Sequence, residues 1–170
     1  MGHLEYKLVP NLSAQIMYIR YMDDCLVISK TRKNNEVLFN ELNGLHNKIS
    51  FTREIEENSE LPFLDILITK NNNNFLTSIH RKNTFTGQYL NYNSFCSKRQ
   101  KINLIKTLYH RAYKICSPCL LETETNKIRD ILINNGYPDN LINKEIKLHS
   151  DRLKKSKSIG LSLWQNIISY

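Results

Sequence analysis

The sequence predicts an α+β fold, in which antiparallel β-hairpins and a helix fill the first half of the chain and helices fill the second half. Up to about residue 81, apolar residues gather in short runs of β-branched and aromatic side chains joined by polar links. Beyond about residue 95, apolar residues recur every three or four positions among Lys and Arg, as in amphipathic helices. We therefore expect two segments within the 170 residues, 1–90 and 91–170.

The first predicted hairpin consists of two β-type runs, residues 16–22 and 25–29, that are separated by Asp23-Asp24. A two-residue polar link between such runs is typical of a tight antiparallel hairpin. The second run is apolar at nearly every position, which is the pattern of a strand buried on both faces.

Further elements complete the predicted first segment. Apolar residues at helical spacing predict a helix over residues 31–48. A short strand is expected at 51–55, and a second hairpin at 62–69 and 75–81. Residues 71–74 are four consecutive Asn and should form its turn, because Asn tolerates left-handed backbone angles.

Three helices are expected in the second segment. The first spans residues 98–116 and ends at a Ser-Pro step, and the second spans about 121–134 and stops at Asn135-Gly136. Asp139 can cap a third helix that runs to about residue 153. Short helices joined by tight turns are typical of a helix-turn-helix arrangement, although a plain helical bundle fits the pattern equally well.

The net charge of +8 is unevenly distributed along the chain. Residues 1–90 hold 10 Lys+Arg and 10 Asp+Glu, whereas residues 91–170 hold 14 Lys+Arg and 6 Asp+Glu. All of the positive excess therefore lies in the second segment. Such asymmetry indicates either a polyanionic partner for that segment or a solvated basic surface.

The adjacent carboxylates Asp23 and Asp24 interrupt an apolar hairpin, where Asn-Gly would make a better turn. Like charges side by side repel each other, and a divalent magnesium ion would neutralise them with the hard oxygen ligands that it prefers. Two-metal centres of nucleotidyl transfer use carboxylates in this way. The alternative is a pair of solvated acids in a turn.

The tetrapeptide Tyr21-Met22-Asp23-Asp24 in a β-hairpin resembles the metal motif in the palm of reverse transcriptases. Longer strings resemble the Penelope-like retroelement family in particular, and the resemblance covers about residues 15–140. Asn83 departs from the family pattern, which usually has Pro after the basic pair. The strings are Leu61-Pro-Phe-Leu-Asp-Ile-Leu67, His80-Arg-Lys82, Gly87-Gln-Tyr-Leu-Asn-Tyr-Asn-Ser94 and Asn135-Gly-Tyr-Pro138.

The resemblance implies a part of an RNA-directed DNA polymerase. Asp23, with Asp24 as its less essential neighbour, would be the catalytic ligand of Mg²⁺, and Tyr21 and Met22 would lie near the primer end or the incoming deoxynucleotide. The helices would form the thumb, or a helix-turn-helix-like unit, on an RNA template with a DNA primer. The expected nucleic-acid contacts are Arg81, Lys82, Lys98, Arg99, Lys101, Arg111, Lys114, Lys154 and Lys155.

A complete polymerase palm also needs a further carboxylate from an upstream strand, and fingers that bind the nucleotide. Only about 20 residues precede the Tyr-Met-Asp-Asp motif, so we expect this chain alone to be an incomplete enzyme. The alternatives are a catalytically inactive, helix-turn-helix-like fragment that binds nucleic acid, or a degenerate copy of an element.

Smaller signals concern location and zinc. The chain has neither an N-terminal apolar run nor a stretch of roughly 18 apolar residues, so we expect an intracellular protein of the nucleus or cytoplasm that does not enter membranes. Cys116 and Cys119 have the spacing of half a zinc site or are reduced cysteines at a helix end. The basic residues 152–157 are either a nuclear localisation signal or a solvated helix end.

Overall fold

A computed structural model describes the protein over residues 16–72 and 74–168. The chain divides into two compact units, residues 1–64 and 65–170. The mixed α+β class that the sequence predicts is confirmed, with small antiparallel sheets followed by a helical segment. The predicted division at residue 90 stays a prediction, and the structure groups the second hairpin with the helices.

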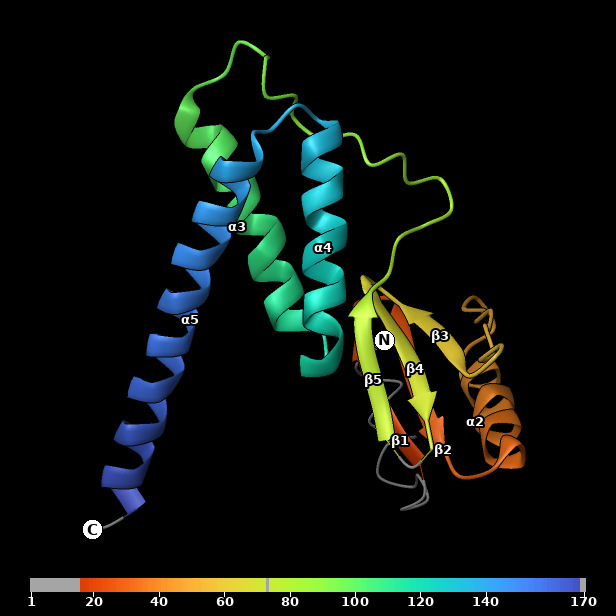
Figure 1. Ribbon diagram of the computed structural model, residues 1–170. Helices are drawn as coiled ribbons and strands as arrows, with labels where there is room; N and C mark the ends of the chain where they lie inside the picture. The colour runs from red at the N-terminus through yellow and green to blue at the C-terminus, as the bar shows by residue number, and fades with distance from the viewer. Residues whose placement is uncertain (1–15, 73, 169–170) are drawn as a thin grey trace. The chain divides into compact units, whose positions relative to one another are not determined.

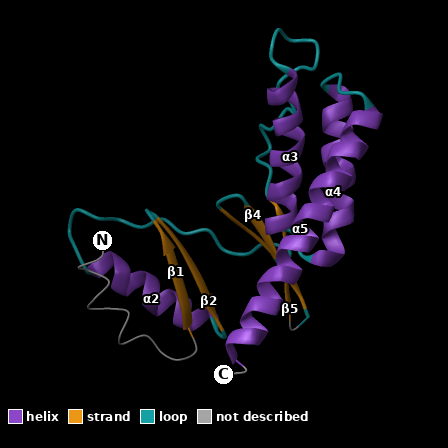
Figure 2. Ribbon diagram, turned by 90° about the vertical axis from the view of Figure 1, so that its left-hand side faces the viewer, coloured by secondary structure: helices purple, strands orange, loops and turns teal. Residues whose placement is uncertain are grey.

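The first unit is built on an antiparallel hairpin of β1 (Ile16–Tyr21) and β2 (Asp24–Ser29). Its register pairs Tyr21 with Asp24 and Ile16 with Ser29. Figure 2 shows α2 (Arg32–Gly44) running beside this hairpin. A small core forms where Leu38 and Leu42 of α2 pack against Ile16, Tyr18 and Val27. In β2 only Leu26 is buried, so the expectation of a strand buried on both faces is wrong.

Three further predictions are wrong in detail. The helix ends at Gly44 rather than at residue 48. Residues 51–55 form no strand, because the Phe51 N–H donates to the Asn43 side-chain oxygen (2.7 Å) and its ring packs on the small core. The predicted strand over 62–69 is interrupted after β3 (Glu60–Phe63), where Leu64 has a left-handed φ of 54°.

The second unit begins with the hairpin of β4 (Ile66–Asn71) and β5 (Asn74–Ile79), whose register pairs Asn71 with Asn74. Asn72 has a φ of 51°, so the predicted turn in the Asn run is confirmed. The hairpin is fastened to the helices at Thr77. Its hydroxyl donates to the Ile115 carbonyl oxygen (2.6 Å), and its N–H donates to the Ser117 hydroxyl (2.9 Å).

Three helices complete the second unit, α3 (Lys98–Ile115), α4 (Pro118–Asn134) and α5 (Asp139–Ile168). Figure 1 shows α3 and α4 side by side, with α5 running along α3. Their common core is formed by buried side chains from all three helices and from the turn before α5. These are Ile105, Ala112, Cys116, Ile128, Leu132, Tyr137 and Ile142.

The helix limits differ from the predicted ones for local reasons. Pro118 is the first residue of α4 rather than only the end of α3, because the first turn of a helix does not need the missing N–H. Ser97 caps α3 in a capping box with Gln100.

In the described part of the chain, no helix is both long and apolar enough to cross a membrane.

Candidate nucleic-acid interface

The unit boundary sharpens the charge asymmetry of the sequence. Residues 1–64 hold 7 Lys+Arg and 9 Asp+Glu, a net charge of −2. Residues 65–170 hold 17 Lys+Arg and 7 Asp+Glu, a net charge of +10. The second unit is therefore the polycationic part of the protein, and the first unit is slightly acidic.

The turn between α4 and α5 gives the second unit a helix-turn-helix geometry. Gly136 lies in this turn with a φ of 82°, a conformation that glycine adopts without steric cost. The buried Asn135 fixes the turn to the segment before α3. Its side chain accepts the Tyr89 N–H (2.9 Å) and donates to the Gly87 carbonyl oxygen (2.8 Å), and its own carbonyl accepts the Tyr92 N–H (2.9 Å).

Helix α5, which follows that turn, has one face against α3 and one face in solvent. On the inner face Ile142 is buried, Glu145 pairs with Lys106 (3.4 Å), and His149 Nε2 lies 3.3 Å from Nδ1 of His110. Burial, with His110 and the nearby cations, lowers the pKa of His149. The exposed residues of the outer face are mostly amides and cations. They are Asn140, Asn143, Lys144, Lys147, Leu148, Asp151, Arg152, Lys154 and Lys155.

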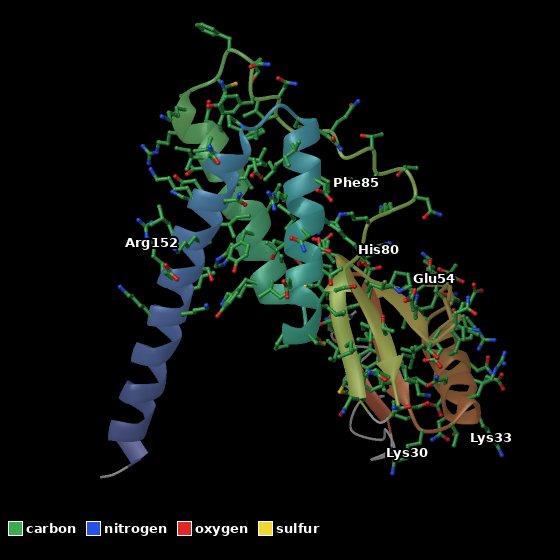
Figure 3. The ribbon with its side chains drawn as sticks, in the orientation of Figure 1. Lys30, Lys33, Glu54, His80, Phe85 and Arg152 are labelled. Atoms are coloured by element: carbon green, nitrogen blue, oxygen red, sulfur yellow. The ribbon has the colours of Figure 1, made fainter. Side chains whose placement is uncertain are left out.

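Most of the basic residues singled out in the sequence lie at the surface. Figure 3 shows Arg152 on the side of α5 that points away from α3. Near the two ends of α3, three further predicted cations are exposed at positions 98, 99 and 114. The exposed members of the predicted set are Lys82, Lys98, Arg99, Lys114, Lys154 and Lys155.

Three of the predicted contact residues also have partners within the second unit. Arg81 binds the buried carboxylate of Glu124. Lys101 donates to the Ser94 carbonyl oxygen (3.0 Å) and lies over the Tyr92 ring, and Arg111 pairs with Asp65 (2.9 Å). Glu124 and Asp65 are distant in sequence from their partners, and Ser94 lies seven positions before Lys101, so a run of basic residues does not reveal these contacts.

Lys144 and Lys147, which the sequence analysis missed, lie on the exposed face of α5. They stand one turn apart and follow the capping signal at Asp139. Helical spacing counted from that signal places both on the face opposite the buried Ile142 and Glu145. Counting helical positions from Asp139 could therefore have identified Lys144 and Lys147 from the sequence.

The predicted carboxylate site is a solvent-exposed hairpin turn in the first unit. The turn consists of Met22 and Asp23, and Asp24 is the first residue of β2, so the predicted turn at Asp23-Asp24 is shifted by one residue. Tyr21 and Met22 are 56% and 70% exposed, and Met22 has a left-handed φ of 52°. The Arg20 guanidinium donates to the Met22 carbonyl oxygen (2.8 Å) and braces the turn.

The donor set around this turn is incomplete for a metal ion. Asp23 and Asp24 are hard oxygen donors of the kind that Mg²⁺ prefers. Within residues 16–72 and 74–168, however, no three His, Cys, Asp or Glu side chains come together as metal ligands. The described residues therefore hold no zinc cluster at Cys116 and Cys119 either, and both thiols are free.

Comparison with protein families gives one match in the second unit. Residues 88–147 match the animal helix-turn-helix domain, a range that covers α3, α4 and the first part of α5. No family model of a reverse transcriptase matches the chain. No curated protein matches it. No solved structure matches it either.

Proposed function

We propose that the second unit binds nucleic acid, mainly through the phosphate backbone. The observation that carries the proposal is the helix-turn-helix match over residues 88–147, which falls on the unit with a net charge of +10. Phosphate contacts supply most of the non-specific affinity of such proteins. A polycationic surface on this kind of domain is therefore expected to have nucleic acid as its partner.

Helix α5 is the part of this unit that best suits a groove. It is the second helix of the pair formed with α4, which is the position of the recognition helix in helix-turn-helix proteins. Its exposed face carries Asn140, Asn143, Lys144 and Lys147 in its first turns. The lysines there would bind phosphates and the asparagines would donate hydrogen bonds to backbone oxygens, while Lys98, Arg99 and Lys114 would add phosphate contacts.

The test is fluorescence anisotropy of a labelled RNA–DNA duplex at several salt concentrations. If about 4–6 phosphates are engaged, the affinity should fall with a log–log slope on the order of −3 to −5. A duplex of scrambled sequence should bind equally well, because phosphate contacts carry no base information. Absence of binding at low salt, or binding that ignores salt, would refute the proposal. Strong preference for one sequence would point to base readout instead.

A second proposal concerns the first unit, whose hairpin resembles the metal motif of a reverse transcriptase palm. We propose that this unit comes from a Penelope-like RNA-directed DNA polymerase, and that Asp23 helps to hold Mg²⁺ together with a carboxylate outside the described residues. The support is the exposed antiparallel hairpin that presents Asp23 and Asp24. When bound, magnesium would supply electrostatic stabilisation of nucleotidyl transfer.

Two measurements test this second proposal. The genomic sequence upstream of Met1 should encode, in frame, a palm strand with the further carboxylate, and unrelated coding sequence there would contradict the proposal. Primer extension with magnesium and all four deoxynucleotides should show no template-dependent synthesis by this chain alone. Extension that is lost on Asp23→Ala would show that the site is already complete.

A further inference from the structure

A cleft of about 280 Å³ lies within the second unit, beside the end of β5. Its floor is apolar and is formed by Ile79, Leu108, Ile128 and Ile131. Its rim is formed largely by the segment that follows β5, where Figure 3 labels His80 and Phe85. Ligand pockets typically measure about 300–1,000 Å³, so this cleft suits a group no larger than a single nucleotide.

One wall of the cleft is aromatic. The rings of Phe85 and Tyr89 meet edge to face with centroids 6.0 Å apart. The guanidinium of Arg81 lies over the Phe85 ring, 5.7 Å from its centroid. Phe85 is nevertheless 38% exposed, so part of its ring surface is open to a further flat group. Such surfaces stack on nucleobases regardless of their identity.

The rim of the cleft also carries positive charge that is available to an anion. Arg111 pairs with Asp65 through one terminal nitrogen (2.9 Å), and the Asp65 side chain is 73% exposed. An ion pair this exposed is weak, so a phosphate can compete for the guanidinium. The exposed Lys82 and the half-buried His80 line the same rim.

We propose that this cleft binds one unpaired nucleotide of a single-stranded nucleic acid. The base stacks at Phe85 and Tyr89 over the apolar floor, and its phosphate binds Arg111 and Lys82 in place of the Asp65 carboxylate. The base must be unpaired, because paired bases in a duplex keep their faces stacked on each other. This inference rests on the proposed function, and it adds a single-strand site distinct from the outer face of α5.

The proposal that a phosphate displaces the Asp65 carboxylate from Arg111 is tested by changing Asp65. Asp65→Asn removes the carboxylate that competes for Arg111 and should tighten binding of a labelled, short oligothymidylate on the order of threefold. Asp130→Asn is the matched control, because it removes the same charge from an exposed site on α4 that does not line the cleft. It should tighten binding less than Asp65→Asn does.

Two losses of function complete the experiment. Phe85→Leu should weaken oligothymidylate binding roughly tenfold and leave duplex binding unchanged. Arg111→Gln should weaken oligothymidylate binding more than Lys70→Gln does. Lys70→Gln is the control, because it removes the same charge from β4 outside the cleft. Thermal denaturation confirms that each variant is folded.

The possible results separate the two proposals. Equal effects of Asp65→Asn and Asp130→Asn, or an unaltered affinity of Phe85→Leu for oligothymidylate, overturn the cleft site. If salt-dependent duplex binding persists in that case, the proposed function still stands. Absence of both single-strand and duplex binding at low salt overturns the proposed function together with the cleft.

Discussion

The guanidinium of Arg81, just beyond β5, binds the carboxylate of Glu124 on α4, and the Glu124 side chain is only 3% exposed. This hydrogen-bonded partner raises the pKa of Arg81. The pair joins residues 43 positions apart and fixes the hairpin of the second unit to its helices. Arg81 therefore acts in the folded structure of the unit rather than as a free surface cation.

Removing Arg81 should destabilise the second unit strongly, because Glu124 would keep an unpaired charge in the protein interior. We expect Arg81→Ala to lower the free energy of unfolding by about 3 kcal/mol in urea denaturation. The double variant Arg81→Met with Glu124→Leu should recover most of that loss, because it removes both charges. A single variant that unfolds like the wild-type protein would show that the pair contributes little.

The contact between His149 and His110 should make the second unit sensitive to mild acid. Burial, then His110 and the cations Lys106 and Arg152, hold the pKa of His149 below 6.5. The unfolded chain therefore binds this proton more readily than the folded one does. The stabilising effect of the neutral ring is complete above about pH 6.5 and is lost as the pH falls below that value.

The measurement is thermal denaturation of wild-type protein and His149→Gln between about pH 7 and pH 5. The wild-type melting temperature should fall more steeply than that of the variant. Glu145, one helical turn before His149 on α5, pairs with Lys106 (3.4 Å). His46→Gln, an exposed histidine of the first unit, is the control and should keep the wild-type slope. Parallel slopes for His149→Gln and wild-type protein would contradict the assignment.

Gly136 sits in the turn before α5 with a φ of 82°, so a side chain there is strained, although a Cβ would make only ordinary van der Waals contacts, the nearest with the Tyr92 Cβ at 3.7 Å. Gly136→Ala should destabilise the second unit by about 1 kcal/mol, as measured by chemical denaturation. Gly44→Ala is the contrast, because a Cβ at that position meets nothing within 4 Å and Gly44 has no left-handed φ. It should be neutral or slightly stabilising, and equal losses for the two variants would contradict this account.

The parts of the fold that were predicted correctly depend on local chemistry. The antiparallel hairpin around Met22 and Asp23 follows from two β-type runs with a short link. The end of α4 at Asn134 follows from Asn135-Gly136, because glycine adopts the left-handed conformation at a helix terminus. Both of these structures are determined by residues that lie within a few positions of each other in the sequence.

The errors arise where a distant partner decides the outcome. Phe51 lies in a β-type run, but its N–H donates a hydrogen bond to the Asn43 side chain and its ring packs against the small core of the first unit. Whether basic residues 81, 101 and 111 contact nucleic acid stays a prediction, but the sequence alone does not reveal that each has a partner within its own unit. The family resemblance to reverse transcriptases rests on short strings and stays a proposal, whereas the helix-turn-helix arrangement is matched over residues 88–147.

The central claim is that the exposed face of α5 binds nucleic acid, and paired charge reversals test it most directly. Lys144→Glu with Lys147→Glu alters that face, and Lys33→Glu with Lys48→Glu makes the same charge change at exposed sites of the first unit. The measurement is the dissociation constant for a labelled RNA–DNA duplex at constant salt. We predict roughly tenfold weaker binding for the α5 pair and a much smaller change for the control pair. Equal weakening by both pairs would mean that net charge alone, and not this face, governs binding.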